Sequence, residues 1–244
     1  MHNSLLFLLV VFLSNIIQAI TGFAGTVLAM PFSVMLIGYA GAKTILNAVG
    51  LAASIGVVIL EFRHIVFKEF GKMTGIMLPG IITGNFIAPY LADDQNLLYK
   101  LLGSIVILFA AFNFYKLYRR QKLKKPPLAL AILLIACAGL VHGMFVCGGP
   151  MLIAYASEAI DGKEEFRSTV SAVWIILNGI MLFTDIHAGN FSVGNVPSLL
   201  LVSLAALALA LFIGNLIEHK INKRTFMMVS YVMMVISGAS LLIK

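Results

Sequence analysis

Long apolar stretches dominate this 244-residue chain and restrict it to helices within a membrane. Hydrophobic residues make up 61% of the chain and charged residues only 11%, whereas soluble domains carry about 25% charged residues. Backbone polar groups in lipid must be satisfied inside the protein, which favours helices. The sequence therefore predicts an all-α polytopic integral membrane protein with no soluble domain. The stretches cover 4–38, 44–60, 70–91, 96–117, 128–157, 168–184, 195–217 and 225–243.

Two of these stretches are broken near their middle by glycines. The breaks are "TGFAGTVLAMP" (21–31) and "HGMFVCGGP" (142–150). Each arm beside a break has about 17 residues or fewer, and a full crossing needs about 20. Irregular backbone at membrane depth is tolerated only where it is buried in protein or lines a wet cavity. We therefore expect two re-entrant helical hairpins, each followed by three transmembrane helices.

The two halves of the chain resemble each other. The sequence divides into a first membrane repeat (1–117), a basic linker (118–127) and a second membrane repeat (128–244). "TGNFI" (83–87) matches "IGNLI" (213–217), and the spacing of a histidine and a glycine in 61–71 recurs in 183–194. Several matches in the same order indicate an internal duplication.

The distribution of Lys and Arg orients these repeats. If both broken stretches return to the side they came from, 14 of the 17 basic residues face one side, and only Lys43, Lys100 and Lys244 face the other. The positive-inside rule makes the first side, which holds the linker, cytoplasmic and places both termini outside. A hairpin plus three spans makes the repeats inverted, a recurring plan of secondary transporters. A net charge of +7 then reflects loops beside anionic membrane lipid, and nucleic acid is not an expected partner.

The hairpins predict an anion site. The second arm of each begins just after the glycines, so its free N–H groups and positive dipole end point at the break. Glycine lets a ligand approach the main chain closely, and helix N-termini are ready sites for anions. Two such ends facing each other would hold a small anionic substrate in mid-membrane.

With these breaks and its basic central linker, the whole chain resembles the TauE/SafE family, also called the toluene sulfonate uptake permease family. The resemblance implies a permease that moves sulfite, sulfonates, sulfoacetate or related anions across the bacterial inner membrane. The residues on the two motifs are Thr21, Gly22, Phe23, Gly25 and Pro31, and Gly143, Gly148, Gly149 and Pro150.

Polar side chains at membrane depth are the other candidates for substrate contact. Small polar residues there either pack helices or coordinate a ligand. His142 has three interpretations: a neutral structural histidine, a substrate contact, or the carrier of a coupling proton. Trp174 fits a cavity wall or a lipid interface, and the pair Asn15 and Gln18 fits helix packing or a cavity lining. The remaining candidates are Asn47, Cys147, Thr169, Ser171 and Asn178.

We therefore expect a secondary transporter and not an enzyme, with no cofactor and no bound metal. The alternatives are a membrane-embedded enzyme, for which His142 and Cys147 form the only close pair, and a non-transporting membrane subunit. The chain has no "GxxxxGK[ST]" motif, so this chain is not expected to use ATP directly. Residues 158–167, "EAIDGKEEFR", are expected to form a solvated loop, and gating by its charges is the alternative. The sequence leaves oligomeric state open.

Overall fold

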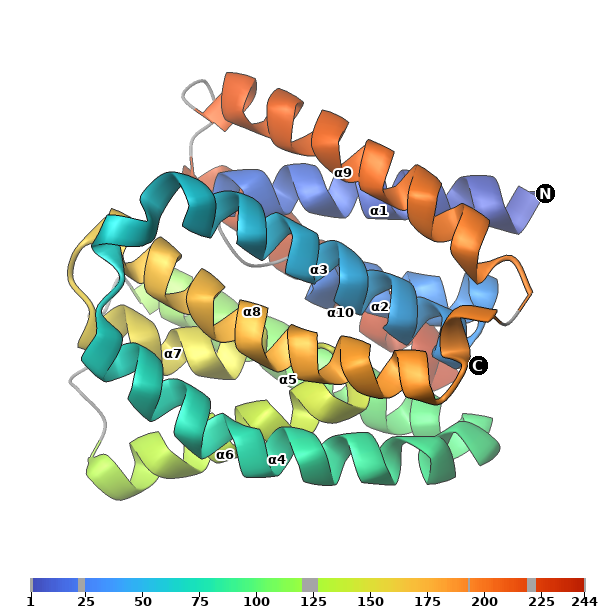
Figure 1. Cartoon of the computed structure of the whole chain (residues 1–244), viewed down its shortest axis with the longest axis horizontal. Coiled ribbons are helices and arrows are strands. Elements are labelled where there is room, and N and C mark those ends of the chain that lie inside the picture. Colours follow the sequence, from blue (N-terminus) through green and yellow to red (C-terminus); the bar gives the residue numbers. More distant parts are fainter. Residues whose placement is uncertain (1, 22–24, 120–126, 193, 219–222, 244) are drawn as a thin grey trace.

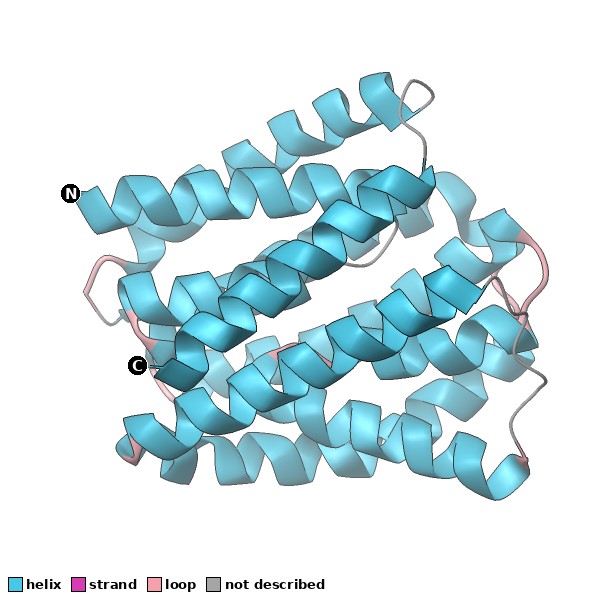
Figure 2. Ribbon diagram, turned by 180° about the vertical axis from the view of Figure 1, so that it is seen from behind, coloured by secondary structure: helices cyan, strands magenta, loops and turns pink. Residues whose placement is uncertain are grey.

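The computed structural model describes residues 2–21, 25–119, 127–192, 194–218 and 223–243. These residues form helices and short connections and include no strand, which confirms the all-α prediction (Figures 1 and 2). Seven of the described helices are long and apolar enough to cross a membrane. The α-helices are α1 (His2–Thr21), α2 (Gly25–Ile37), α3 (Tyr39–Glu61), α4 (Phe67–Asp93), α5 (Gln95–Arg119), α6 (Leu128–Phe145), α7 (Gly149–Ala159), α8 (Lys163–His187), α9 (Val196–Glu218) and α10 (Lys223–Ile243), with 3-10 turns η1 (Phe62–His64) and η2 (Asn190–Ser192).

Both broken stretches form helix pairs. Figure 1 shows that α1 starts and α2 ends at the end of the bundle that holds both termini and residues 188–192, here called the terminus end. The pair α6–α7 starts and ends at the opposite end, the linker end, which holds residues 62–66 and 160–162. The second arms α2 and α7 have 13 and 11 residues, too few to cross. The first arms are longer than predicted, with 20 residues in α1 and 18 in α6, and both are long enough to span.

Two helices begin earlier than the apolar pattern indicates. Gly38 adopts a φ of 79°, which favours glycine, and this turn lets α3 start at Tyr39. Lys43 therefore lies inside a helix and is buried, not in an outer loop as the charge count assumed. The expectation of a loop over 158–167 holds only for residues 160–162, because α7 extends to Ala159 and α8 begins at residue 163. Glu164 and Glu165 lie in its first turn, where carboxylates favour a helix.

The two halves interlock, because helices of each half pack against helices of the other. In the described residues, α1 of the first half packs on α9 of the second, and α6 of the second packs on α4 of the first. The other large contacts between the halves join α3 to α8 and α5 to α10, and Figure 2 shows the last two helices side by side. A twofold exchange of halves interchanges α1–α9 with α4–α6 and maps the other pairs onto themselves. This packing supports the inverted repeat, which stays a prediction.

Small residues allow close approach of the helices in the pairs α4–α6 and α1–α9. A methyl group on Gly84 of α4 would overlap the Leu140 carbonyl oxygen of α6, and one on Gly214 of α9 would overlap the Ala19 side chain of α1. These two glycines belong to the matching segments 83–87 and 213–217, so the sequence match marks equivalent contacts. Close approach at glycine is typical of helix packing in membranes.

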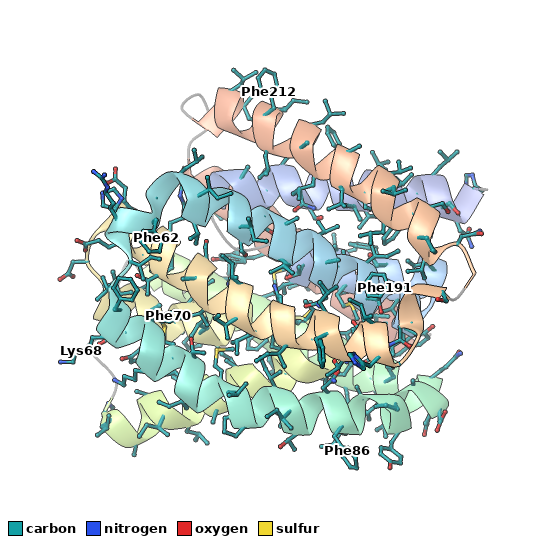
Figure 3. The ribbon with its side chains drawn as sticks, in the orientation of Figure 1. Phe62, Lys68, Phe70, Phe86, Phe191 and Phe212 are labelled. Carbon is teal, nitrogen blue, oxygen red and sulfur yellow. The ribbon has the colours of Figure 1, made fainter. Side chains whose placement is uncertain are left out.

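The outside of the bundle is apolar. Phe86 of α4 and Phe212 of α9 point away from the bundle at its opposite edges and are 69% and 65% exposed (Figure 3). In water such large apolar surfaces would be unfavourable, whereas lipid tails cover them at no hydrophobic cost. The exterior therefore fits the predicted contact with membrane lipid.

The predicted orientation is testable by labelling. We expect single cysteines at residues 2 and 190 to react with an impermeant maleimide applied from outside, and one at 122 to react only after the membrane is opened. Residue 122 belongs to the part of the linker, 120–126, that lies outside the described residues. The background replaces the free thiols Cys137 and Cys147 by serine and alanine. If only the cysteine at residue 122 were labelled from outside, the orientation would be the opposite of the predicted one.

Candidate functional site

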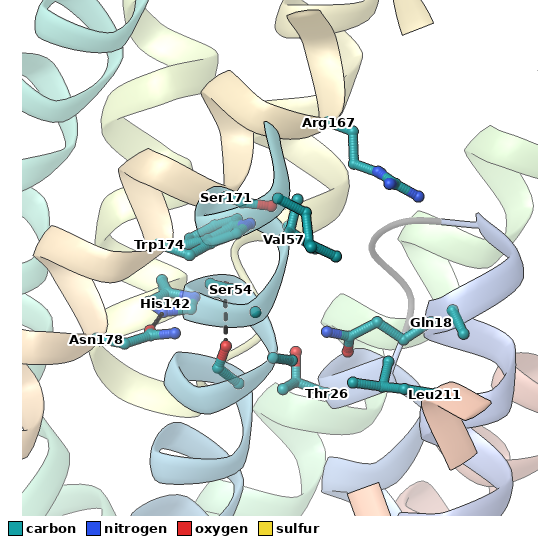
Figure 4. Close-up of a pocket in the computed structure, with 16 residues that line it drawn as sticks. Gln18, Thr26, Ser54, Val57, His142, Arg167, Ser171, Trp174, Asn178 and Leu211 are labelled. Atoms are coloured by element: carbon teal, nitrogen blue, oxygen red, sulfur yellow. Dashed lines mark hydrogen bonds between the residues drawn. The ribbon is translucent and has the colours of Figure 1, made fainter. Parts of the chain in front are cut away.

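A cavity of about 290 Å³ lies between the two helix pairs (Figure 4). Water occupies about 30 Å³ in the liquid, so the cavity has room for a small anion and several waters. Gln18, Thr26 and Leu211 face the side chains of α6 and α8 across it. The lining residues are Gln18, Ala19, Thr26, Gly50, Ala53, Ser54, Gly56, Val57, Leu60, His142, Gly149, Arg167, Ser171, Trp174, Asn178 and Leu211.

The second arms of both helix pairs begin at this cavity. Thr26 is the second residue of α2, and Gly149 is the first residue of α7. The first N–H groups of a helix have no partner within it, and the dipole makes that end positive. Pro150 carries no N–H, so it removes one donor from α7 but fits the first helical turn. The two helix starts therefore supply positive ends from opposite walls.

His142 and Asn178 form the polar floor of the cavity. The Nε2 atom of His142 lies 2.7 Å from Asn178 Oδ1, and the imidazole stacks on the Trp174 ring at a centroid distance of 4.5 Å. His142 is 3% exposed, and its Nδ1 has no hydrogen-bond partner among the described residues. Below them, Asn47 Nδ2 donates to the Asn178 carbonyl oxygen at 3.1 Å. This arrangement fixes the orientation of the imidazole by stacking and by one neutral amide.

An ion pair stands at the linker end of the cavity. Glu61 is the last residue of α3. Its two carboxylate oxygens accept hydrogen bonds from Nε and a terminal nitrogen of Arg167 in α8. Ser168 Oγ adds a bond to the Glu61 carbonyl oxygen at 2.8 Å. Arg167 lines the cavity, and Glu61 is not among its lining residues. Among the described lining residues, the Arg167 guanidinium therefore supplies the positively charged side chain.

The turn between α6 and α7 is conformationally demanding. Val146 follows α6 with a φ of 56°, a left-handed conformation that costs a β-branched residue roughly 1–3 kcal/mol. Its N–H donates to the His142 carbonyl oxygen at 2.8 Å, which ends the helix. A methyl group on Gly148 would overlap the Ala138 carbonyl oxygen of α6. The turn therefore requires glycine at 148 and holds the start of α7 against His142.

The structure brings four of the predicted site residues to the cavity. His142, Gly149, Ser171 and Asn178 line it, although they are separated by up to 36 positions in sequence. Gly25 lies directly behind the lining, because a methyl group there would meet the side chain of Gln18. Contact of these residues with a substrate stays a prediction.

Other predicted residues lie away from the cavity lining. Gly143 packs against Ile81 and Asn85 of α4, and Cys147 is buried in the apolar core. Thr169 accepts a hydrogen bond from the Val66 N–H before α4, so its hydroxyl holds a helix connection. Asn47 and Gly148 support the floor and the turn from behind. Gly22 and Phe23 lie outside the described residues, as does the side chain of Thr21.

Several lining residues were not predicted. The face of α3 that carries Gly50, Ala53, Ser54 and Val57 lines the cavity, and its signal is a row of small residues at helical spacing. Gln18 was left between a cavity lining and helix packing, and Trp174 between a cavity wall and a lipid interface. The structure places both in the cavity wall. Arg167 was considered only as part of the charged cluster 158–167, which the sequence placed in a loop.

The lining chemistry favours an anion. Gln18, Thr26, Ser171 and Asn178 offer hydroxyl or amide donors, whereas the Ser54 hydroxyl already donates to the Gly50 carbonyl oxygen. Arg167 adds a positive charge. None of the described lining residues carries a carboxylate. Donors and helix N-termini stabilise negative charge, and a cavity without carboxylates does not repel it.

Comparison with known proteins places the chain in a family. A family profile described as "Sulfite exporter TauE/SafE" matches residues 7–241. Searches of curated proteins and of solved structures gave no match. The profile covers nearly the whole chain, including both helix breaks and every lining residue of the cavity. The chain therefore belongs to the TauE/SafE family, a family of membrane transporters for sulfite-type anions.

Proposed function

We propose that this protein is a secondary transporter that moves a small organic or sulfur-containing anion, such as sulfite, a sulfonate or sulfoacetate, across the bacterial inner membrane. The observation that carries the proposal is the cavity between the two helix starts, whose described lining residues include donors and an arginine but no carboxylate. The cavity extends to Leu60 and Arg167 at the linker end, which the positive-inside rule makes cytoplasmic. The structure thus resembles the inward-open state of an alternating-access carrier.

The geometry gives no support to His142 and Cys147 as the catalytic pair of a membrane-embedded enzyme. A catalytic role for His142 and Cys147 would need the two side chains to act on one another or on a shared reactant. His142 instead bonds to Asn178 and stacks on Trp174, whereas Cys147 packs in the apolar core. A binding and transport role uses the donors of the cavity without any such pair.

Counterflow in proteoliposomes tests the proposed function. Purified protein is reconstituted into vesicles that are preloaded with unlabelled sulfite, methanesulfonate, sulfoacetate or acetate, and uptake of labelled sulfite is followed. We expect preloading with the sulfur oxyanions to accelerate uptake, because a carrier exchanges ligands at one site, and acetate to accelerate it less. Uptake no faster than in protein-free vesicles for the whole panel would contradict the proposal.

Arg167 should strengthen the attraction of anions to the cavity. We expect Arg167→Met to raise the half-saturation concentration for the anion roughly tenfold, because it removes a positive charge and leaves Glu61 uncompensated. Initial counterflow rates across a range of anion concentrations measure this. Arg63→Met removes an exposed arginine of η1 at the same end that does not line the cavity, and it should leave the half-saturation concentration unchanged. Equal effects of the two variants would indicate a general surface potential instead.

A further inference from the structure

A second polar cluster lies away from the cavity, near the terminus end of α3 and α8. It contains two ionisable side chains, Lys43 of α3 and Asp185 of α8, which are only 6% and 4% exposed. The apolar pattern placed both near segment ends, where charged residues are common. Their burial inside a membrane protein is costly, and intramembrane charges usually mark an ion pathway or a proton relay.

Each charged group of the cluster is held by neutral partners. Lys43 Nζ donates to Asn85 Oδ1 at 2.7 Å, and Asn85 Nδ2 donates to Thr184 Oγ1 at 3.0 Å. Asn190 Nδ2 donates to Asp185 Oδ1 at 2.9 Å. The second carboxylate oxygen, Oδ2, is buried and forms no hydrogen bond of standard geometry with the described residues, although the Thr44 side chain lies close to the carboxylate.

Lys43 and Asp185 interact electrostatically without forming a direct ion pair. The two charges influence one another, yet the bonds of Lys43 go to Asn85 and not to the carboxylate. An ionised carboxylate with a bare oxygen is unfavourable in a low-dielectric interior, whereas a protonated carboxyl is not. The cluster is therefore built so that one proton can be gained or lost without a change in its hydrogen-bonded frame.

The cluster and the cavity lie on opposite sides of the cavity floor. α3 and α8 run in opposite directions, so the cavity residues lie toward the linker end of both helices and Lys43 and Asp185 toward the terminus end (Figure 1). Asn47 and Asn178 separate the two sites. Lys43 is also close enough to His142 to act on it electrostatically. Among the described residues, Tyr39 also lies close to Asp185, and its hydroxyl donates to the Met144 carbonyl oxygen. Cys147 in turn lies close to Tyr39.

We propose that Lys43 and Asp185 form the proton-binding site that couples anion movement to a pH gradient. This inference rests on the proposed transport function. With Asp185 ionised, the ammonium and carboxylate charges cancel; when the carboxylate takes up one proton, the positive charge of Lys43 is left uncompensated. That charge favours an anion in the adjacent cavity, so the proton and the anion stabilise one another's binding and travel in the same direction. Such mutual stabilisation is reciprocal by thermodynamic necessity.

The geometry favours this pair over His142 as the proton carrier. His142 has a neutral amide and an indole ring as its direct partners, and no carboxylate is bonded to it among the described residues. Such surroundings suit a neutral imidazole that contacts substrate. Asp185, by contrast, has a second charged group beside it and an oxygen free to take a proton.

The test compares two activities of the same vesicles. Wild-type protein is reconstituted at internal pH 7.5 with the membrane potential clamped, and accumulation of labelled sulfite is measured at external pH 6.5 and 7.5, next to counterflow at equal pH. A one-to-one coupling supports up to about tenfold accumulation per pH unit. We expect Asp185→Asn to abolish the pH-driven accumulation and to retain counterflow. His142→Gln is expected to transport more slowly, because His142 lines the cavity, but its accumulation should still depend on the pH gradient. Asp93→Asn, which alters an exposed carboxylate at the end of α4, should behave as wild type.

The outcomes separate the two proposals. Counterflow without pH-driven accumulation in the wild type, or full accumulation in Asp185→Asn, would overturn the proton site. Absence of counterflow in the wild type would instead overturn the proposed function. If Asp185→Asn fails to fold because it leaves Lys43 uncompensated, the double variant Lys43→Met/Asp185→Asn removes both charges. In the same vesicle assays, the folded double variant should then show counterflow without pH-driven accumulation. Retained accumulation would overturn the site.

Discussion

Gly149→Leu is expected to abolish anion transport while the protein still inserts and folds. Gly149 is the first residue of α7 and lines the cavity, so a leucine side chain there would occupy the space in front of the free N–H groups. The cavity holds only about 290 Å³, and a branched side chain at its wall displaces the anion and its waters together. Counterflow of labelled sulfite in proteoliposomes should fall to the level of protein-free vesicles.

A glycine-to-leucine substitution on the exposed surface of the bundle provides the matched control for the expected loss of transport. Gly75 of α4 is exposed, and a methyl group there would meet nothing, so Gly75→Leu should transport as the wild type does. Gly25→Leu should lose transport as Gly149→Leu does, because its side chain would push the Gln18 side chain into the cavity. Normal counterflow in both the Gly25 and Gly149 variants would remove the helix starts from the binding site.

The sequence predicted the parts of the site that depend on backbone. Glycines in the middle of an apolar stretch signal a break, because lipid offers no partners for freed N–H and C=O groups. The structure indeed ends α1 at Thr21 and α6 at Phe145, and both second arms start at one cavity. His142, Ser171 and Asn178 were found for a related reason, since polar side chains at depth need an internal location.

The sequence could not predict the parts that depend on where helices end and how they cross. Lys43 and Arg167 read as loop residues because the apolar windows stop short of them, yet a glycine turn and an acidic first turn extend α3 and α8 over both. Gly143 read as part of the anion site because it lies beside a break. Its close neighbours come from α4, and only the crossing of α4 and α6 reveals that role.

Close glycine contacts between the halves should carry much of the stability of the bundle. We expect Gly84→Ala to destabilise the protein by roughly 2 kcal/mol and to lower its melting temperature by about 4–8 °C, because the added methyl group overlaps a carbonyl oxygen of α6 that cannot move without shifting the helix. Thermal unfolding in detergent, followed by intrinsic fluorescence, measures the change. Gly75→Ala, on the exposed face of the same helix, should leave the melting temperature within about 1 °C of the wild type or raise it slightly.

Gly214→Ala tests whether the second half repeats the contact. Its methyl group would meet the Ala19 side chain and approach the Ile16 carbonyl oxygen of α1, so it should also lower the melting temperature, although a side chain yields more easily than a backbone carbonyl. We expect the melting temperature of Gly84→Ala to be lower than that of Gly214→Ala, and both to be lower than that of Gly75→Ala. If Gly214→Ala were as stable as Gly75→Ala, α1 and α9 would not be held as α6 and α4 are. The matching segments 83–87 and 213–217 would then share residues without sharing a structural role, and the inverted repeat would lose its strongest physical support.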